Sequence, residues 1–253
     1  MKEKDLTSKY ERIIKKRIIE GRYRIGEKIP PLRDLAAELN CSRSVINVVI
    51  ARIAVQGYLR IQKRQKTVVN DFLSSGSLNI IADIIDSDNK ELKLKILESV
   101  LAARKLIEVE SVRLASRRQE EEEIKTLEGI IESEEDLIRE GVDNFLTIAE
   151  SDFTFHNHLI TMSGNTLYRI FMNSMKDVAL DLTKLFYEHN FSTFPEYVAC
   201  HRQILTAIKN EREAEAAATL AGILEHGEKL FIKHFREENN GENQDTEESD
   251  AKD

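Results

Sequence analysis

From residue 90 to residue 237 the chain places apolar side chains at a helical period, and few glycine or proline residues interrupt it. The stretches that show this period are 92–119, 120–135, 137–162, 166–189, 195–209 and 212–237. The alternation of β-branched residues that favours strands is absent from them. Helices in such a series bury their apolar stripes against one another, so the pattern predicts an all-α bundle of about six or seven antiparallel helices.

The overall composition is that of a globular protein. Apolar residues make up 41% and charged residues 32% of the 253 residues, a balance that excludes intrinsic disorder and allows one large or two ordinary domains. No apolar run reaches the ~18–20 residues of a membrane span, and the first residues are charged rather than signal-like. The only cysteines, Cys41 and Cys200, form neither a disulfide framework nor a C-x-x-C site. We therefore expect a protein of the reducing cytoplasm without a membrane partner.

The charges are divided unevenly along the chain. Residues 1–70 contain 17 Lys and Arg against 7 Asp and Glu, whereas the remaining residues contain 20 against 38. A basic segment beside an acidic one favours a nucleic-acid partner, because clustered cations release counterions from a polyanion; an ordinary solvated surface is the alternative. Residues 237–253 carry 8 acids and one lysine without apolar periodicity, which predicts a disordered tail.

The basic segment has the pattern of a winged helix-turn-helix domain over residues 1–70. Helical periods at 9–20 and 32–39 are followed by a third helix from Ser42, an N-cap residue, to about Gln56. Asn40 is suited to the left-handed position between the second and third helices. Two short alternating strands, 58–62 and 67–70, then surround a basic tip at 63–66. In such a domain the second helix of the helix-turn-helix presents its first turn to base edges in the major groove.

The motifs of this segment resemble those of the GntR family of bacterial regulators. They are P-P-L-R-D-L-A at 30–36, C-S-R-S-V at 41–45 and G-Y-L at 57–59. The resemblance implies binding to a double-stranded DNA operator through Arg33, Ser42, Arg43, Ser44, Asn47, Lys63, Arg64 and Lys66. Asn47 stands where the family usually has arginine, so one guanidinium contact to guanine is expected to be either lost or replaced by an amide contact to adenine. The tip also lacks the family's glycines, which favours contacts of its cations with phosphates or the rim of the minor groove over a tight insertion.

The helical segment resembles the ligand-binding domain of the FadR branch of this family, the FCD domain. The motifs are A-R-K-L-I-E at 103–108, D-F-T-F-H at 152–156, S-G-N at 163–165 and H-R-Q-I-L-T-A-I at 201–208. The resemblance implies an effector-binding and dimerisation domain over 91–236, joined to the first domain by a linker at 71–90 that contains a short helix. It also implies a homodimer.

A metal site is the chemistry that these motifs indicate. Asp152 and His156 are four residues apart on one predicted helix and project from the same face, while His201 lies on another helix. In the resembled family one aspartate and three histidines hold a divalent metal, of the zinc, nickel or manganese kind, which in turn holds a small carboxylate effector. The third histidine is the open point: the family's interval falls on Ile223, and His226 lies three residues beyond it.

Simpler interpretations of these residues remain open. Asp152 and His156 are also spaced for an ordinary side-chain contact, and His201 for a position near a helix N-terminus. Arg104 lies on an apolar stripe, where a cation needs an anion. That anion is either Glu108 one turn later or the carboxylate of an effector. The resemblance adds Asn165, from the S-G-N motif, to the candidate effector-binding residues.

A second resemblance favours a different effector. The segments V-N-D-F at 69–72, S-G-S-L-N-I at 75–80 and N-S-M-K at 173–176 are similar to those of fatty-acyl-responsive members, which have lost metal histidines and bind acyl-coenzyme A. We therefore expect a DNA-binding transcriptional regulator modulated by a metal-held acidic metabolite, with an acyl-coenzyme A effector as the alternative. A metal enzyme is disfavoured because H-E-x-x-H, G-x-S-x-G and P-loop motifs are absent. A sequence-indifferent architectural DNA binder is disfavoured by the large acidic domain.

Overall fold

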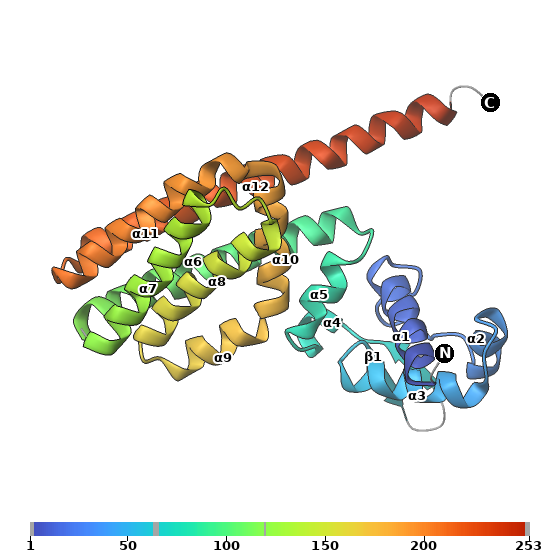
Figure 1. Ribbon diagram of the computed structural model, residues 1–253. Coiled ribbons are helices and arrows are strands. Elements are labelled where there is room, and N and C mark those ends of the chain that lie inside the picture. The colour runs from blue at the N-terminus through green and yellow to red at the C-terminus, as the bar shows by residue number, and fades with distance from the viewer. Residues whose placement is uncertain (1–2, 63–65, 119, 251–253) are drawn as a thin grey trace. The chain divides into compact units, whose positions relative to one another are not determined.

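The computed structural model describes residues 3–62, 66–118 and 120–250, and the chain divides into two compact units between Leu97 and Glu98 (Figure 1). The first unit contains a small antiparallel sheet and the second is helical, which confirms the predicted fold class. None of the described helices is long and apolar enough to cross a membrane.

The N-terminal unit is a winged helix-turn-helix. Its elements are α1 (Glu3–Ile19), α2 (Leu32–Glu38), α3 (Arg43–Val55), β1 (Leu59–Gln62) and β2 (Lys66–Val69). The two strands pair with Leu59 opposite Val69 and Gln62 opposite Lys66. α3 packs against α1 and α2, so its inward side chains, Ile46, Val49, Ile50 and Ile53, are buried.

Local signals in the sequence place the turn between α2 and α3. Asn40 adopts a positive φ of 50°, which reverses the chain after α2. The hydroxyl of Ser42 then accepts a 3.3 Å hydrogen bond from the Val45 amide and caps the N-terminus of α3, as its residue type predicts. These two residues fix where α3 begins.

Residues 71–90, predicted as a linker with a short helix, contain that helix and pack within the N-terminal unit. They form α4 (Phe72–Ser75) and α5 (Asn79–Ile85), and α5 packs against α1. Phe72, Ile80 and Ile84 are buried in the same apolar cluster as the side chains of α1 and α3. A polar sequence with Gly76 is typical of a linker, but these three apolar side chains find partners in the adjacent core, which is a tertiary effect.

The C-terminal unit is a helical bundle. Its helices are α6 (Lys90–Arg118), which begins in the first unit, α7 (Glu121–Arg139), α8 (Phe145–Met162), α9 (Thr166–Ser174), α10 (Lys176–Asn190), the 3₁₀ turn η1 (Phe191–Thr193), α11 (Phe194–Lys209) and α12 (Glu213–Asp250). α8 packs against α7 and α10, whereas α11 packs against α7 and α12 (Figure 1). The interior is formed largely by α8 and α11.

Three predicted boundaries differ from the structure. α7 continues past residue 135 to Arg139, and the break comes at Gly141, whose φ of 67° favours glycine. The predicted helix 166–189 is divided at Met175 into α9 and α10. α12 continues to Asp250 where a disordered tail from 237 was expected. No proline interrupts that segment, and its glutamates have good helix propensity.

Candidate functional site

The first turn of α3 carries the polar side chains that the sequence predicted to meet DNA. Arg43, Ser44 and Asn47 are all exposed on this helix. The hydroxyls of Ser42 and Ser44 lie 2.8 Å apart, so Ser42 contributes to the cap and to the outward face together. Arg33 is exposed at the start of α2, within an ion-pair distance of Asp34. The structure thus leaves Arg33, Arg43 and Asn47 accessible to a nucleic acid.

Apolar side chains that the sequence analysis did not single out continue this face of α3. Val48 is 46% exposed and Val55 is 90% exposed, and Ala51 between them is exposed as well. Together with Asn47 and Arg52 they line a shallow groove beside Glu11 of α1. Their signal was available in the sequence, since residues 44, 48, 51 and 55 follow a helical period opposite the buried stripe.

Most of the basic tip at 63–66 lies outside the described part of the chain. Lys63 and Arg64 lie outside the described residues, as does the side chain of Lys66. The backbone of Lys66 pairs with Gln62 at the end of the strands. The proposed phosphate contacts of these three residues therefore remain predictions.

The predicted metal-ligating residues of the second unit lie together. Asp152 and His156 of α8 and His201 of α11 are all buried, and one potential ligand atom from each lies within 4.8 Å of the others. Asp152 and His156 project from one face of α8, with 3.8 Å between Oδ2 and Nε2. Because α8 and α11 both pack on α7, the fold brings to one point side chains far apart in the sequence.

Each histidine of this group contacts a buried glutamate through Nδ1. His156 Nδ1 lies 2.5 Å from Oε2 of Glu108 on α6, and His201 Nδ1 lies 2.9 Å from Oε2 of Glu134 on α7. An ionised carboxylate can only accept, so where the glutamate is ionised the imidazole Nδ1 is the donor. The remaining nitrogen of a neutral ring is then a lone-pair atom. For His201 this Nε2 is buried and has no hydrogen-bond partner among the described residues.

Asp152 is fixed by a tyrosine. The hydroxyl of Tyr187 on α10 donates a 2.9 Å hydrogen bond to its Oδ1. Burial, and then the charge of Asp152 and this hydrogen bond, raise the pKa of Tyr187 well above its ordinary value. The phenol is therefore a neutral donor at any physiological pH, and Oδ2 is left facing His156 and Arg104.

Arg104 forms the internal ion pair that the sequence left open. Its Nε donates a 2.6 Å hydrogen bond to Oε1 of Glu108, and its terminal nitrogen lies 3.9 Å from Oδ2 of Asp152. Burial alone would raise the pKa of Glu108, but the charge of Arg104 and the contacts with His156 lower it to about 2. The arginine side chain remains 22% exposed, so it reaches both this buried carboxylate and the surface.

Glu134 is the buried polar neighbour of this group that the sequence did not indicate. It is fully buried, one of its oxygens has no hydrogen-bond partner among the described residues, and burial raises its pKa, partly offset by His201. Leu127, Ile131 and Glu134 form the buried stripe of α7. A glutamate in register with two buried aliphatic residues was the available signal.

Two other predicted residues lie outside this group. His226 is exposed on α12, and its Nδ1 lies 3.1 Å from the hydroxyl of Tyr197, whereas Ile223 is the inward residue, as its register indicated. His226, the doubtful member of the predicted ligand set, therefore lies outside the group that the structure brings together. Asn165 caps α9 by accepting hydrogen bonds from the amides of Leu167 and Tyr168. The S-G-N motif thus has a structural basis as a turn between α8 and α9.

Family models match both units of the chain. Residues 6–69 match the model described as bacterial regulatory proteins, gntR family, and residues 99–226 match the FCD domain. The chain belongs to the GntR family, with an FCD domain. It is therefore a transcriptional regulator of the GntR/FadR type: its winged helix-turn-helix is the DNA-binding domain and its helical bundle is the effector-binding domain. Members of such families are normally not enzymes.

Similar proteins have regulatory names. A fatty acid metabolism regulator protein of Shewanella oneidensis is 28% identical over 173 residues, 66% of this chain and 65% of that protein. Its namesake in Shewanella frigidimarina is 32% identical over 74 residues, 29% of this chain and 31% of that protein. The Exu regulon transcriptional regulator of Escherichia coli is 40% identical over 50 residues, 20% of this chain and 19% of that protein. The chain thus spans less than two thirds of each of these relatives.

Solved structures show the same fold. The Listeria monocytogenes protein Lar, said to control expression of the agr system, gives a TM-score of 0.58 at 14% identity, over 90% of this chain and 97% of Lar. Escherichia coli McbR/YncC gives a TM-score of 0.50 at 16% identity, over 91% of this chain and 98% of that one. At these identities the similarity concerns the fold alone.

Proposed function

We propose that the chain binds a two-fold operator as a homodimer, and that a small carboxylate, held through a divalent metal in the FCD domain, changes its affinity for that operator. The observation that carries the proposal is the buried group of Asp152, His156 and His201, in which Nε2 of His201 has no partner among the described residues. A buried lone pair without a donor is costly, and a cation is the partner that suits it.

The donor set fits such a cation. It consists of two imidazole side chains and one aspartate side chain, a combination that suits zinc, nickel or manganese. Both rings have their Nδ1 engaged by glutamates, which is the usual arrangement behind a metal-bound histidine. With Ile223 in the position of a further histidine, three protein ligands leave positions for an exogenous ligand. A bound divalent cation would supply those positions and positive charge for a carboxylate.

The surrounding residues orient this group. Tyr187 holds one oxygen of Asp152, so the carboxylate is fixed with the other directed toward His156. Arg104 keeps Glu108 ionised and lies beside Asp152 with part of its side chain exposed. We propose that this exposed part of Arg104 contacts the effector carboxylate, while Asn165, a helix cap, supports the turn before α9 and contacts it only at the margin.

DNA recognition is proposed to use the outward face of α3. Arg43, Ser44 and Asn47 would contact base edges, while Arg33, Lys63, Arg64 and Lys66 would contact phosphates. One short helix reads too few base pairs for selectivity, so two copies related by a two-fold axis are required. Because the partner is chromosomal DNA, the place of action we propose is the bacterial cytoplasm, and no catalytic activity is part of the proposal.

A second candidate is an effector that needs no metal. The S. oneidensis relative is named as a fatty acid metabolism regulator, and this chain has Ile223 where a metal site would gain a further histidine. A fatty acyl thioester of coenzyme A is therefore the alternative ligand.

Equilibrium dialysis of the full chain against zinc, nickel and manganese separates these candidates. We expect about one ion per chain in the wild type, loss of the ion in His201→Ala and retention in the control variant His226→Ala. If the wild type holds none of the three ions, the metal proposal is wrong. A fall in operator affinity on adding long-chain acyl-coenzyme A, in the same metal-free protein, would then favour the alternative.

A further inference from the structure

We infer that Glu134 is a positioning residue that holds His201 in the Nδ1–H tautomer and directs Nε2 into the group formed with Asp152 and His156. This inference deepens the proposed metal site and rests on it for its functional meaning. Nothing in the sequence motifs assigns a role to Glu134, which lies on α7 outside all of them.

The contact between the two residues determines where the ring proton lies. Glu134 and His201 are both 0% exposed, and Oε2 of the first lies 2.9 Å from Nδ1 of the second. In the arrangement that we infer, Glu134 accepts as a carboxylate, so the ring proton of His201 is on Nδ1 and the lone pair is on Nε2. A free histidine side chain in water prefers the opposite tautomer. Glu134 therefore selects the form that can bind a cation through Nε2.

The ring is also held in its plane by an aromatic neighbour. Phe155 of α8 stacks on His201 with 3.6 Å between ring centroids and 12° between planes. Stacking alone permits a 180° rotation about the Cβ–Cγ bond, which keeps the ring plane but exchanges the positions of nitrogen and carbon atoms. The contact of Nδ1 with Glu134 selects one of these two orientations. The two contacts together fix the direction of Nε2.

Glu108 contacts His156 in a similar way, but it also has a second hydrogen-bond partner. Glu108 also accepts from Arg104, so its charge is balanced within the protein. Glu134 has one buried oxygen without a partner among the described residues, and its other oxygen contacts His201. Among the described residues no lysine or arginine forms an ion pair with Glu134, so its contact with His201 is not shared with a cationic side chain as that of Glu108 is.

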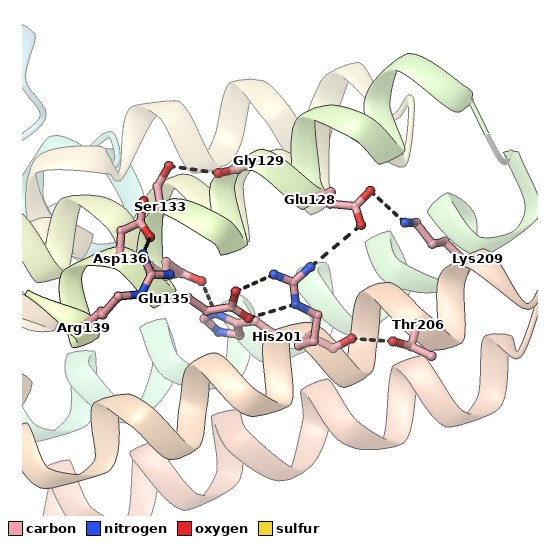
Figure 2. A network of polar contacts seen from close by, with 11 residues as sticks. Glu128, Gly129, Ser133, Glu135, Asp136, Arg139, His201, Thr206 and Lys209 are labelled. Carbon is pink, nitrogen blue, oxygen red and sulfur yellow. Dashed lines mark hydrogen bonds and ion pairs between the residues drawn. The ribbon is translucent and has the colours of Figure 1, made fainter.

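The neighbouring residues on the same two helices supply a matched control. Arg202, next to His201, donates to both oxygens of Glu135 at 2.9 and 2.7 Å, and Lys209 donates to Glu128 at 2.8 Å (Figure 2). These ion pairs lie on the solvent-exposed side of the interface between α7 and α11, and they link the two helices. Glu135 therefore tests the register of the helices, whereas Glu134 tests the orientation of the histidine.

The decisive experiment combines zinc affinity with direct observation of the tautomer. Zinc competition with a chromophoric chelator, on the full chain, should show about 10–100-fold weaker binding in Glu134→Gln. Glu135→Gln should bind like the wild type. Two-bond ¹⁵N–¹H correlation spectra of the metal-free wild type should show the Nδ1–H tautomer for His201, assigned by its loss in His201→Gln, and a shift toward Nε2–H in Glu134→Gln.

The outcomes separate this inference from the metal proposal. A wild type that binds no zinc but shows the Nδ1–H tautomer, lost in Glu134→Gln, supports the positioning role and refutes the metal. A wild type with the Nε2–H tautomer overturns the positioning role without use of any variant, so the folding of Glu134→Gln does not decide the matter. Zinc binding lost in His201→Ala but unchanged in Glu134→Gln also overturns it.

Discussion

The hydroxyl of Tyr58, the residue that precedes β1, donates a 2.8 Å hydrogen bond to the carboxylate of Asp83 on α5. Lys15 of α1 lies 3.1 Å from the same carboxylate and covers the tyrosine ring. The contact joins the G-Y-L motif of the helix-turn-helix to the segment 71–90. α5 is therefore a structural part of the DNA-binding unit, and its apolar side chains complete the core of that unit.

Removing this hydroxyl should destabilise the N-terminal unit by an amount that depends on pH. Burial, and then the charge of Asp83, raise the pKa of Tyr58 above its ordinary value of 10. Because the pKa is higher in the folded state, the protonated phenol stabilises that state fully below pH 10. This contribution is lost as the pH rises from 10 through the folded-state pKa. We expect Tyr58→Phe to cost about 1 kcal/mol at pH 8, and the difference from wild type to shrink above pH 10. Urea unfolding followed by circular dichroism measures it; a difference that stays constant to pH 11 would contradict this account.

Two glycines of the same unit should respond differently to alanine. Gly21 and Gly57 both have positive φ, 77° and 91°, but a Cβ at Gly21 meets nothing within 4 Å, whereas at Gly57 it would lie 2.5 Å from the backbone oxygen of Ser75. Gly21→Ala should cost about 1–2 kcal/mol from backbone strain alone. Gly57→Ala should cost about 1–3 kcal/mol more, because α4 has to move away. Equal melting temperatures of the two variants would show that α4 does not pack against this turn.

The sequence was sufficient for features that depend on local chemistry. Ser42 and Asn40 were placed by residue type, and the common face of Asp152 and His156 followed from their spacing of four residues. The convergence of His201 on them was implied by the family resemblance, since periodicity within one helix says nothing of which helices meet.

What the sequence did not predict depends on tertiary contacts. Segment 71–90 looked like a linker because the partners of its three apolar residues are distant in sequence. Glu134 was overlooked because a carboxylate on an apolar stripe is explained only by a partner, and that partner lies on α11. The break expected near residue 136 came instead at Gly141, where the positive φ ends α7.

The role of Arg43 in base recognition can be separated from phosphate binding. It is exposed at the first position of α3, so Arg43→Ala should cost about 1–3 kcal/mol in operator binding and relax the sequence preference at one base pair. Arg64→Ala, in the predicted tip, should weaken all sequences alike and reduce the slope of log affinity against log salt by about one. Both are measured by titration of operator and random duplexes at several salt concentrations. Unchanged discrimination in Arg43→Ala would show that another part of α3 reads the bases.

The chain's operator should contain a thymine whose 5-methyl group contacts Val48. This side chain is 46% exposed, one residue after Asn47, on the face of α3 that carries Ser44. An exposed valine in the second turn of a recognition helix has an apolar partner in the major groove, which is the thymine methyl. Replacing that thymine by deoxyuridine removes the methyl group and leaves the hydrogen-bonding edge unchanged.

A deoxyuridine scan of an operator selected from random duplexes tests this contact. At one thymine position the substitution should weaken wild-type binding by about 3–4-fold, the equivalent of one buried methyl group at ~0.8 kcal/mol. In Val48→Ala the same substitution should have no effect, because the partner of the methyl group is gone. Val55→Ala, at the far end of α3, should keep the full effect and is the matched control. The contact is wrong if, at every thymine, the deoxyuridine substitution changes the affinity of wild type and Val48→Ala by the same factor. The valine would then not face the bases, and the side of α3 that carries Arg43 would enter the groove instead.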